Sequence, residues 1–390
     1  MKNPISVFFK GDLIRASSMI VLATLSGSAI AFLANLYLSS TLGPKFFGVF
    51  KTLIYLFTFL SFLVGFGMQS TLPKYIAEFK TKNKKKIGHL VNWFLKIRGI
   101  GFLIIGILIF LMRDKIALYL LHDVSLSYLI FPALAFLVAS FFQMFIYIVL
   151  GYQKFRLFAV SLFLSSTLSA VLAVALSPFG LFYIISGWAC GTAIGFLITL
   201  RYLFHEHAFS STIHFNLHKI IWKFSMPMYG LWIIFSLVSV AVPFFSLFFS
   251  QLLIGYYSYA LMFYTASLLI PTAISYVVLP RVSELISLKK MKIAKEILTR
   301  ALKLYTPLVA IGIVTVLLAS EFFILKISPE YFPSLTLFRS VIIFGLLSGC
   351  LLILSFYLQG KGKVKETALI ILSQTILLFL ISFILLRTFV

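Results

Sequence analysis

The sequence predicts an all-α integral membrane protein, a two-lobed helical bundle built from a duplicated six-helix unit with about 11 transmembrane helices. Three observations predict this: the composition, the length of the apolar runs and an internal repeat. Of the 390 residues, 61% are hydrophobic and only 11% are charged, and the mean hydropathy is +1.09. Soluble domains carry about 25% charged residues, so lipid must cover the excess apolar surface of this chain.

Eleven apolar runs are long enough to cross a bilayer, which takes about 20 mostly apolar residues in a helix. They lie at 16–39, 52–73, 93–112, 126–150, 157–176, 180–200, 225–248, 255–279, 304–325, 334–358 and 367–387.

The basic residues predict which side each loop lies on. With the N-terminus inside, 26 of the 33 Lys and Arg residues fall on the cytoplasmic side, as the positive-inside rule requires. We therefore expect a multi-pass protein of the cytoplasmic membrane with a cytoplasmic N-terminus. The same asymmetry explains the net charge of +23 without nucleic acid, so no nucleic-acid partner is predicted. The Lys-rich stretch 80–86 is expected to meet anionic lipid headgroups.

An internal repeat relates the two halves of the chain. Residues 48–74 and 255–281 align at a shift of 207, which pairs Gly48 with Gly255, and the turn at 150–154 faces 359–363 at a shift of 209. Parallel repeats of this kind are typical of duplicated transporters. The predicted organisation is an N-terminal lobe at 1–204, a cytoplasmic linker with a short amphipathic helix at 205–224, and a C-terminal lobe at 225–390. The repeat also places a partner of helix 180–200 near 388–408, so either a twelfth helix is lost or the sequence is truncated.

Several short patterns resemble polysaccharide-biosynthesis flippases, the oligosaccharide and O-antigen flippase branch of the multidrug/oligosaccharidyl-lipid/polysaccharide exporter superfamily. The patterns are Leu42-Gly43-Pro44, Phe47-Gly48-Val49-Phe50, Leu72-Pro73-Lys74-Tyr75, Leu279-Pro280-Arg281 and Gln359-Gly360-Lys361-Gly362-Lys363. The resemblance implies alternating access by two six-helix lobes that move a polyprenyl-pyrophosphate-linked glycan across the membrane. It also implies glycosyltransferases or a polymerase of the same pathway as partners. Family members usually have twelve or fourteen helices, so eleven is a departure.

A lipid-linked pyrophosphate is anionic, so cations inside the spans are candidate ligands. The apolar run after Arg98 has only 14 residues, so helix 3 must include Arg98, which either faces the cavity and contacts phosphate or snorkels to the inner interface. Arg15 and Lys51 flank complete spans, and snorkelling at the interface is the favoured interpretation for both.

Other candidate substrate-binding residues are weaker. Lys74 and its repeat mate Arg281 follow a proline at cytoplasmic helix ends, where they could form a symmetric mouth or simply anchor the topology. Asn35 and Gln69 are predicted to line the cavity, and Thr58, Ser236 and Ser239 belong to the same group of hydroxyl and amide side chains. Tyr257 suits stacking on a sugar or an outer aromatic belt.

Rival functions are a cation-coupled multidrug exporter of the same superfamily, a membrane enzyme of the glycan pathway, and a structural subunit. Proton or sodium coupling usually needs an intramembrane carboxylate, and of the 10 acidic residues only Glu321 enters a span. No large outer loop and no phosphate-binding G-x-x-x-x-G-K-[ST] motif occurs. We therefore predict a transporter rather than an enzyme, with no cofactor and no metal site.

Overall fold

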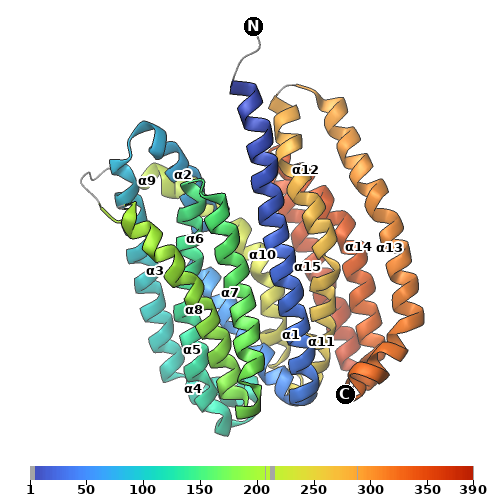
Figure 1. Cartoon of the computed structure of the whole chain (residues 1–390). Coiled ribbons are helices and arrows are strands. Elements are labelled where there is room, and N and C mark those ends of the chain that lie inside the picture. Colours follow the sequence, from blue (N-terminus) through green and yellow to red (C-terminus); the bar gives the residue numbers. More distant parts are fainter. Residues whose placement is uncertain (1–4, 207, 211–215, 288, 390) are drawn as a thin grey trace. The chain divides into compact units, whose positions relative to one another are not determined.

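The computed structural model describes residues 5–206, 208–210, 216–287 and 289–389, and the described residues contain helices and no strand. Side chains at 5–18, 81, 82, 141, 142, 196, 280, 284 and 287 lie outside this description. Figure 1 shows the helices. In chain order they are α1 (Ile5–Leu63), α2 (Met68–Lys82), α3 (Lys85–Leu111), α4 (Arg113–Ile116), η1 (Ala117–Leu121), η2 (Val124–Leu129), α5 (Ile130–Ala139), α6 (Phe141–Gly151), α7 (Phe155–Ala175), η3 (Ser177–Phe179), α8 (Leu181–His205), α9 (His218–Ile220), η4 (Ile221–Ser225), α10 (Met226–Phe245), α11 (Gln251–Ser267), α12 (Leu269–Ser287), α13 (Met291–Ile327), η5 (Pro329–Ser334), α14 (Leu335–Gly360) and α15 (Val364–Arg387).

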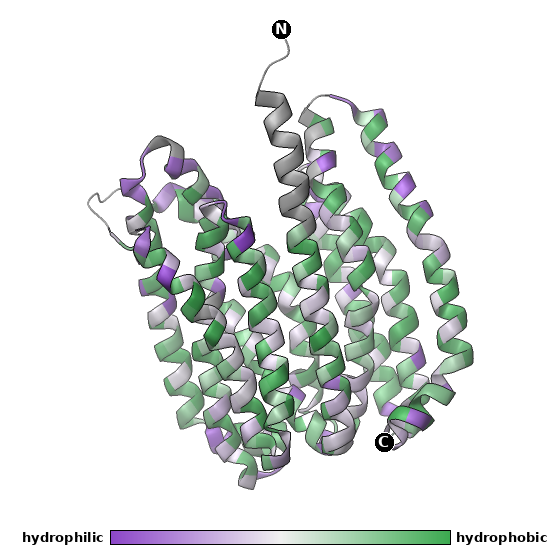
Figure 2. Ribbon diagram, in the orientation of Figure 1, coloured by the Kyte–Doolittle hydropathy of each residue, from purple (hydrophilic) through white to green (hydrophobic). Residues whose placement is uncertain are grey.

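The described residues form 10 helical segments long and apolar enough to span a membrane. The first, Met19–Leu63, contains residues 19–39 of the predicted run 16–39 and the start of the run 52–73, with a kink at Gly43 (φ 68°, ψ 169°) between them. Hydrophobic residues predominate along the helices (Figure 2), and many are exposed: on α13 Leu318 is 77% and Phe322 is 70% exposed. Such surfaces require lipid, which confirms a multi-pass α-helical membrane protein.

The predicted run 52–73 is not one helix. The chain leaves α1 after Leu63 and turns through Phe66 (φ 44°) and Gly67 (φ 71°) before α2 begins at Met68. The break frees backbone oxygens at the end of α1 from helical hydrogen bonds. One of them, Leu63 O, accepts a hydrogen bond from the Tyr229 hydroxyl at 2.7 Å. Hydropathy could not reveal the break, since the turn is itself mostly apolar.

The turn before α7 repeats before α15, as the duplication predicts. Lys154 (φ −87°, ψ 64°) and Lys363 (φ −87°, ψ 65°) have the same backbone conformation. Their N–H groups donate to Val149 O and Leu358 O, respectively. The preceding residues, Gln153 and Gly362, both have positive φ, at 61° and 78°, and glycine adopts that conformation without steric cost.

The helix packing also repeats. In the first half, α6 packs against α2, and a Cβ atom added to Gly151 would lie 3.1 Å from the Leu72 carbonyl oxygen. In the second half, α14 packs against α12, and a Cβ atom on Gly360 would lie 3.1 Å from the Leu279 carbonyl oxygen. These four positions are the pairs that the sequence repeat aligns, so the duplicated helical unit is confirmed.

Packing divides the chain into two compact units. Unit 1 comprises Met1–Ala34 and Thr52–Pro243, and unit 2 comprises Asn35–Lys51 and Phe244–Val390. One apolar core in unit 1 joins α2, α3, α6 and α8, and one in unit 2 joins α12, α13 and α14. The predicted lobes 1–204 and 225–390 rest on the repeat rather than on packing, and they stay a prediction.

The predicted linker 205–224 is described only in part, because residues 207 and 211–215 lie outside the described residues. The Asn216 side-chain oxygen accepts a bond from the His218 backbone N–H at 2.8 Å, and the helix that begins there continues into α10. Leu217 and Ile220 are buried in the core of unit 1. This apolar face therefore packs on protein rather than lying on a membrane surface.

Glycines paired by the repeat form a tight helix crossing in unit 2. A Cβ atom on Gly255 would overlap the Pro44 carbonyl, and one on Gly48 would overlap the Gln251 carbonyl. We therefore expect Gly255→Ala to lower the free energy of unfolding by about 1–3 kcal/mol, measured by thermal unfolding of the purified protein. Gly106→Ala on α3 is the control, because its Cβ would meet nothing within 4 Å. Equal melting temperatures of the two variants would contradict the close approach.

Candidate functional site

Arg98 lies within the spanning helix α3 and is buried, with 1% of its surface exposed. Its Nη1 donates to Met68 Sδ at 2.7 Å, and its Nη2 donates to the Ser140 backbone oxygen at 2.8 Å. The Phe102 ring centroid lies 5.1 Å from the guanidinium carbon. Arg98 thus joins α3 to α2 and to the junction of α5 and α6, and phosphate contact would require the Ser140 bond to open.

Lys51 is buried, so the favoured interpretation that it snorkels at the interface is wrong. Its Nζ donates to the Asn35 side-chain oxygen at 2.6 Å and lies 5.2 Å and 5.4 Å from the ring centroids of Phe47 and Phe50. The physical reason is the kink at Gly43. It folds the second half of α1 back, so that residue 51 meets residue 35. The structure thus brings together two predicted site residues, Lys51 and Asn35.

Two further candidates lie on α2. Gln69 is 6% exposed, and its side-chain oxygen is buried without a hydrogen-bond partner among the described residues. Lys74 is exposed, with its Nζ 3.6 Å from the Phe224 ring centroid and 5.0 Å from that of Tyr75. Gln69 therefore keeps an acceptor in the interior of unit 1, whereas Lys74 lies at the surface.

The remaining three candidates are Arg281, Tyr257 and Arg15. Arg281 on α12 is exposed. Tyr257 is completely buried, with its ring edge-on to Phe245 at 5.1 Å, which is a packing arrangement rather than an exposed aromatic belt. Arg15 lies in the first part of α1, whose side chains are outside the described residues.

A partly open pocket of about 320 Å³ lies in unit 1, with hydroxyl and amide groups set among apolar side chains, and we call it the hydroxyl pocket. Its polar lining includes Ser140, Gln143, Ser165, Ser166, Ser169 and Thr192, together with Thr58 and Ser61 of α1. Thr58 was a predicted lining residue, and the others were missed. A signal for them exists, because Ser161, Ser165 and Ser169 recur every four residues and so share one face of α7. All three are buried.

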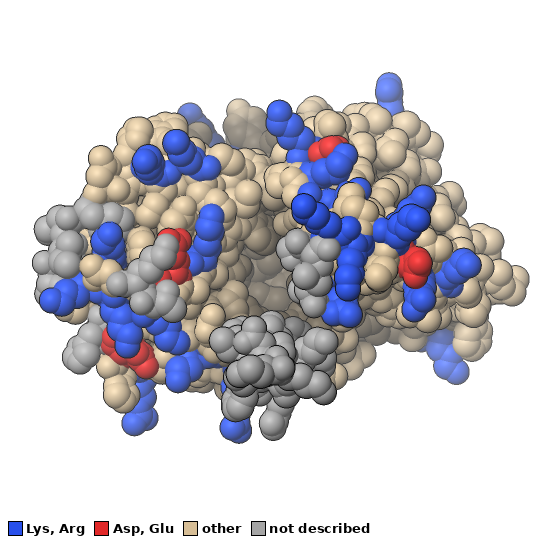
Figure 3. Space-filling view, turned by 90° about the horizontal axis from the view of Figure 1, so that it is seen from above, with Lys and Arg blue, Asp and Glu red and all other residues tan. Residues whose placement is uncertain are grey.

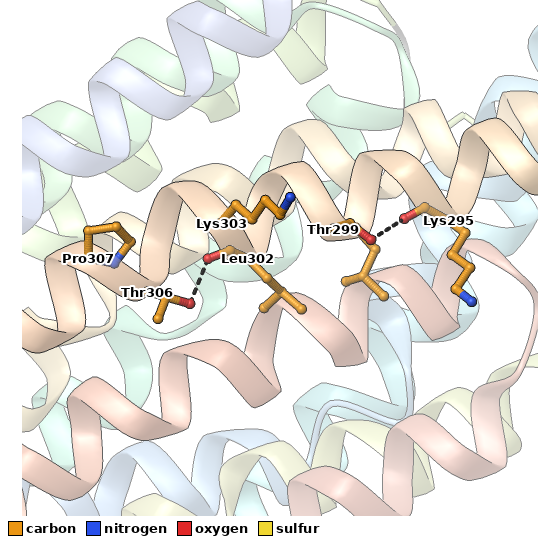
Figure 4. A pocket seen from close by; sticks show the side chains of 7 residues that line it. Lys295, Thr299, Leu302, Lys303, Thr306 and Pro307 are labelled. Atoms are coloured by element: carbon orange, nitrogen blue, oxygen red, sulfur yellow. Dashed lines mark hydrogen bonds between the residues drawn. The ribbon is translucent and has the colours of Figure 1, made fainter.

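A surface groove of about 450 Å³ runs along α13 and is lined by residues of that helix only (Figure 4). Lys295 and Lys303 contribute its cations. The hydroxyl groups of Thr299 and Thr306 donate to the backbone oxygens of Lys295 and Leu302, at 3.1 Å and 2.8 Å. The lysines are therefore its main polar groups available to a ligand.

In the part of the chain that the structure describes, acidic side chains form no cluster in the interior that could bind a cation. Glu321, near the end of α13, is exposed and lies 3.7 Å from the Arg339 guanidinium. The described residues contain no group of three or more His, Cys, Asp or Glu side chains suited to a metal ion. Cationic and hydroxyl side chains therefore dominate the polar interior.

Comparison with known proteins places the chain by both sequence and fold. Residues 13–286 match the family model described as polysaccharide biosynthesis protein. No curated protein matches the chain in a direct sequence comparison.

Two solved structures share the fold over most of the chain. The first is the inward-facing conformation of a multidrug resistance MATE family transporter of the MOP superfamily, with a TM-score of 0.73 and 14% identity over 92% of this chain and 88% of the other. The second is the lipid II flippase MurJ in an inward closed conformation, with a TM-score of 0.72 and 15% identity over 94% and 86%. At these identities the likeness concerns the fold, which is the two-lobed MATE and MurJ fold.

Proposed function

Because the chain belongs to the polysaccharide biosynthesis protein family, we propose that it is a transporter that flips a lipid-linked oligosaccharide or polysaccharide precursor across the cytoplasmic membrane by alternating access. The observation that carries this proposal is the pair of buried cations, Arg98 and Lys51, inside the spanning helices. Charged groups at that depth are costly and usually serve function. A polyprenyl pyrophosphate needs cationic and hydrogen-bonding contacts as it crosses.

The proposed substrate-binding residues are Arg98, Lys51 and Asn35, supported by Gln69 and Lys74. Arg98 and Lys51 each hold a neutral partner, the Ser140 carbonyl and the Asn35 amide oxygen. A phosphate would be a stronger partner than either, since it adds the attraction of opposite charges to the hydrogen bond. Exchange of either partner for phosphate would let that cation hold an anionic headgroup within the membrane.

The location of the basic side chains supports the proposed orientation. Figure 3 shows that Lys and Arg far outnumber Asp and Glu on the face viewed. The exposed lysines include Lys84 and Lys85 near the start of α3 and Lys289, Lys290, Lys292 and Lys295 near the start of α13. We propose that these helix ends lie on the cytoplasmic side, where they meet anionic lipids. Lys295 and Lys303 in the groove of Figure 4 suit a lipid phosphate.

A cation-coupled multidrug exporter is the alternative, because MATE transporters share the fold. Coupling by protons or sodium usually uses a carboxylate inside the membrane. Among the described side chains, the acids within the candidate spans are Glu296, Glu321, Glu330 and Glu366, and each of them is exposed or half-exposed, Glu321 beside Arg339. The acid-poor interior therefore favours the flippase.

Loss of the gene is expected to cause a lipid-linked oligosaccharide to accumulate on the cytoplasmic face of the membrane. The glycosyltransferases that build it would continue to work, whereas its exit would stop. The measurement is mass spectrometry of extracted lipid-linked glycans, combined with a membrane-impermeant glycosidase that reports the side. The complemented strain is the control. An unchanged lipid-linked pool in the deletion strain would count against flipping.

A further inference from the structure

The hydroxyl pocket of unit 1 contains many neutral polar side chains and no formal charge on its described lining residues. Its walls come from α1, α5, α6, α7 and α8 and the Ser140 junction. Hydroxyl groups that served only to stabilise their own helices would not need to line the same pocket. Polar groups that line a pocket in a membrane bundle are satisfied by water or by a polar ligand. This concentration of neutral oxygen atoms indicates a site for a polar ligand.

Five hydroxyl groups of this pocket already donate within the protein, and two of them, Ser169 and Thr192, also lie 3.1 Å apart in a hydrogen bond that either can donate. Thr58 donates to Ile54 O at 2.7 Å, Ser166 donates to Leu162 O at 3.0 Å, and Thr192 donates to Trp188 O at 3.1 Å. Ser61 and Ser169 make bonds of the same kind with backbone oxygens of their own helices. A hydroxyl has one hydrogen and two lone pairs. These side chains therefore offer the pocket acceptors rather than donors.

Gln143 adds another acceptor to the same pocket. Its side-chain oxygen is buried and has no hydrogen-bond partner among the described residues. A buried acceptor without a partner is unfavourable, so a ligand that donates to Gln143 gains affinity. The pocket therefore suits a ligand with several O–H or N–H donors.

The positive charge of Arg98 distinguishes between two kinds of ligand that could donate to these oxygen atoms, a cation and a neutral molecule. Its Nη2 lies 3.5 Å from the Ser140 hydroxyl oxygen, which belongs to the pocket wall. A fixed positive charge so close to a low-dielectric cavity repels a sodium ion or an ammonium group. A neutral molecule with many hydroxyl groups meets no such repulsion.

The remaining walls suit a sugar ring. Trp188, Tyr147 and Phe136 line the pocket beside the oxygen atoms, and aromatic rings offer a rigid apolar surface for the C–H face of a pyranose. The volume of about 320 Å³ lies at the lower end of the roughly 300–1,000 Å³ found for small-molecule sites. A monosaccharide unit therefore fits better than a long chain.

We infer that the hydroxyl pocket is a binding site for a neutral pyranose ring of the transported glycan, whose hydroxyl groups donate to the side-chain oxygens of Gln143, Ser166 and Thr192 while Trp188 packs against its apolar face. This inference rests on the proposed function, because it assigns the sugar part of the same substrate to unit 1. The pocket itself, however, can be tested without transport.

The test is titration of the purified full-length protein in detergent with methyl β-D-glucopyranoside, followed by tryptophan fluorescence. Binding in the millimolar range is expected to change the emission, and Trp188→Phe is expected to abolish that change. Thr192→Val removes one acceptor at nearly constant volume and is expected to weaken binding at least fivefold. Thr315→Val is the matched control, because Thr315 makes the same bond to its own helix, donating to Ile311 O at 2.9 Å, but lies exposed on α13.

Three outcomes would overturn the inference: no saturable change with the glycoside, equal affinities of the Thr192→Val and Thr315→Val variants, or a response to sodium chloride instead of sugar. The last would indicate a cation site. Competition by an extracted lipid-linked oligosaccharide is expected if the pocket serves the transported glycan, and free-sugar binding without competition would contradict that role. Failure of the proposed function has a different signature, which is an unchanged lipid-linked pool after gene loss although the protein binds the glycoside.

Discussion

Replacing Arg98 with methionine is expected to reduce glycan export more than tenfold at equal protein levels in the membrane. Methionine fills a similar length of the buried site but removes the charge and both hydrogen bonds. Under the proposed function, Arg98 is an interior cation beside the hydroxyl pocket, because Nη2 reaches both the backbone and the side chain of Ser140. The measurement is cell-surface glycan in a deletion strain that carries the variant.

Stability must be measured alongside export, because Arg98 also holds the helices together. Loss of the guanidinium removes a charged donor from the Ser140 carbonyl, which then keeps only the Gln143 backbone N–H, so we expect the free energy of unfolding to fall by about 1–3 kcal/mol. Arg113→Met is the control, since Arg113 lies near a helix end with a 38% exposed side chain beside Asp114. Normal export by Arg98→Met at a normal membrane level would show that Arg98 serves packing alone.

Replacing Asn35 with leucine is expected to destabilise the protein by about 1.5–3 kcal/mol, the range for a hydrogen bond to a charged group. The buried Lys51 ammonium would lose the acceptor that it contacts at 2.6 Å. Lys51→Met is expected to cost less stability, because no charge then stays buried. It should nevertheless abolish export if Lys51 binds the pyrophosphate. Thermal unfolding and surface glycan are the two measurements.

The double variant Asn35→Leu, Lys51→Met tests the contact itself. Its cost in unfolding free energy should be smaller than the sum of the single costs by about 0.5–3 kcal/mol, as for residues in direct contact. Lys45→Met serves as the control, because Lys45 is exposed on the same helix. Strictly additive costs would contradict the pairing across the kink at Gly43.

Much of the fold could be predicted because its signals are local. A bilayer sets a minimum apolar length, so run lengths predicted the spans and placed Arg98 inside one of them. The repeat predicted contacts as well. Gly151 with Leu72, and Gly360 with Leu279, make matching close approaches. The site was less predictable, because the partners of Arg98 lie 30 and 42 residues away along the chain.

The sequence by itself determined that this chain spans a membrane many times, carries a duplicated helical unit and places cations within its helices. Each of these follows from composition, run length or internal similarity, which are properties of neighbouring residues. Only the tertiary structure decided that Lys51 is buried against Asn35 and that hydroxyl groups of α1, α7 and α8 meet in one pocket. The physical reason is that a kink angle and the rotation of each helix depend on packing between distant segments, which hydropathy does not record.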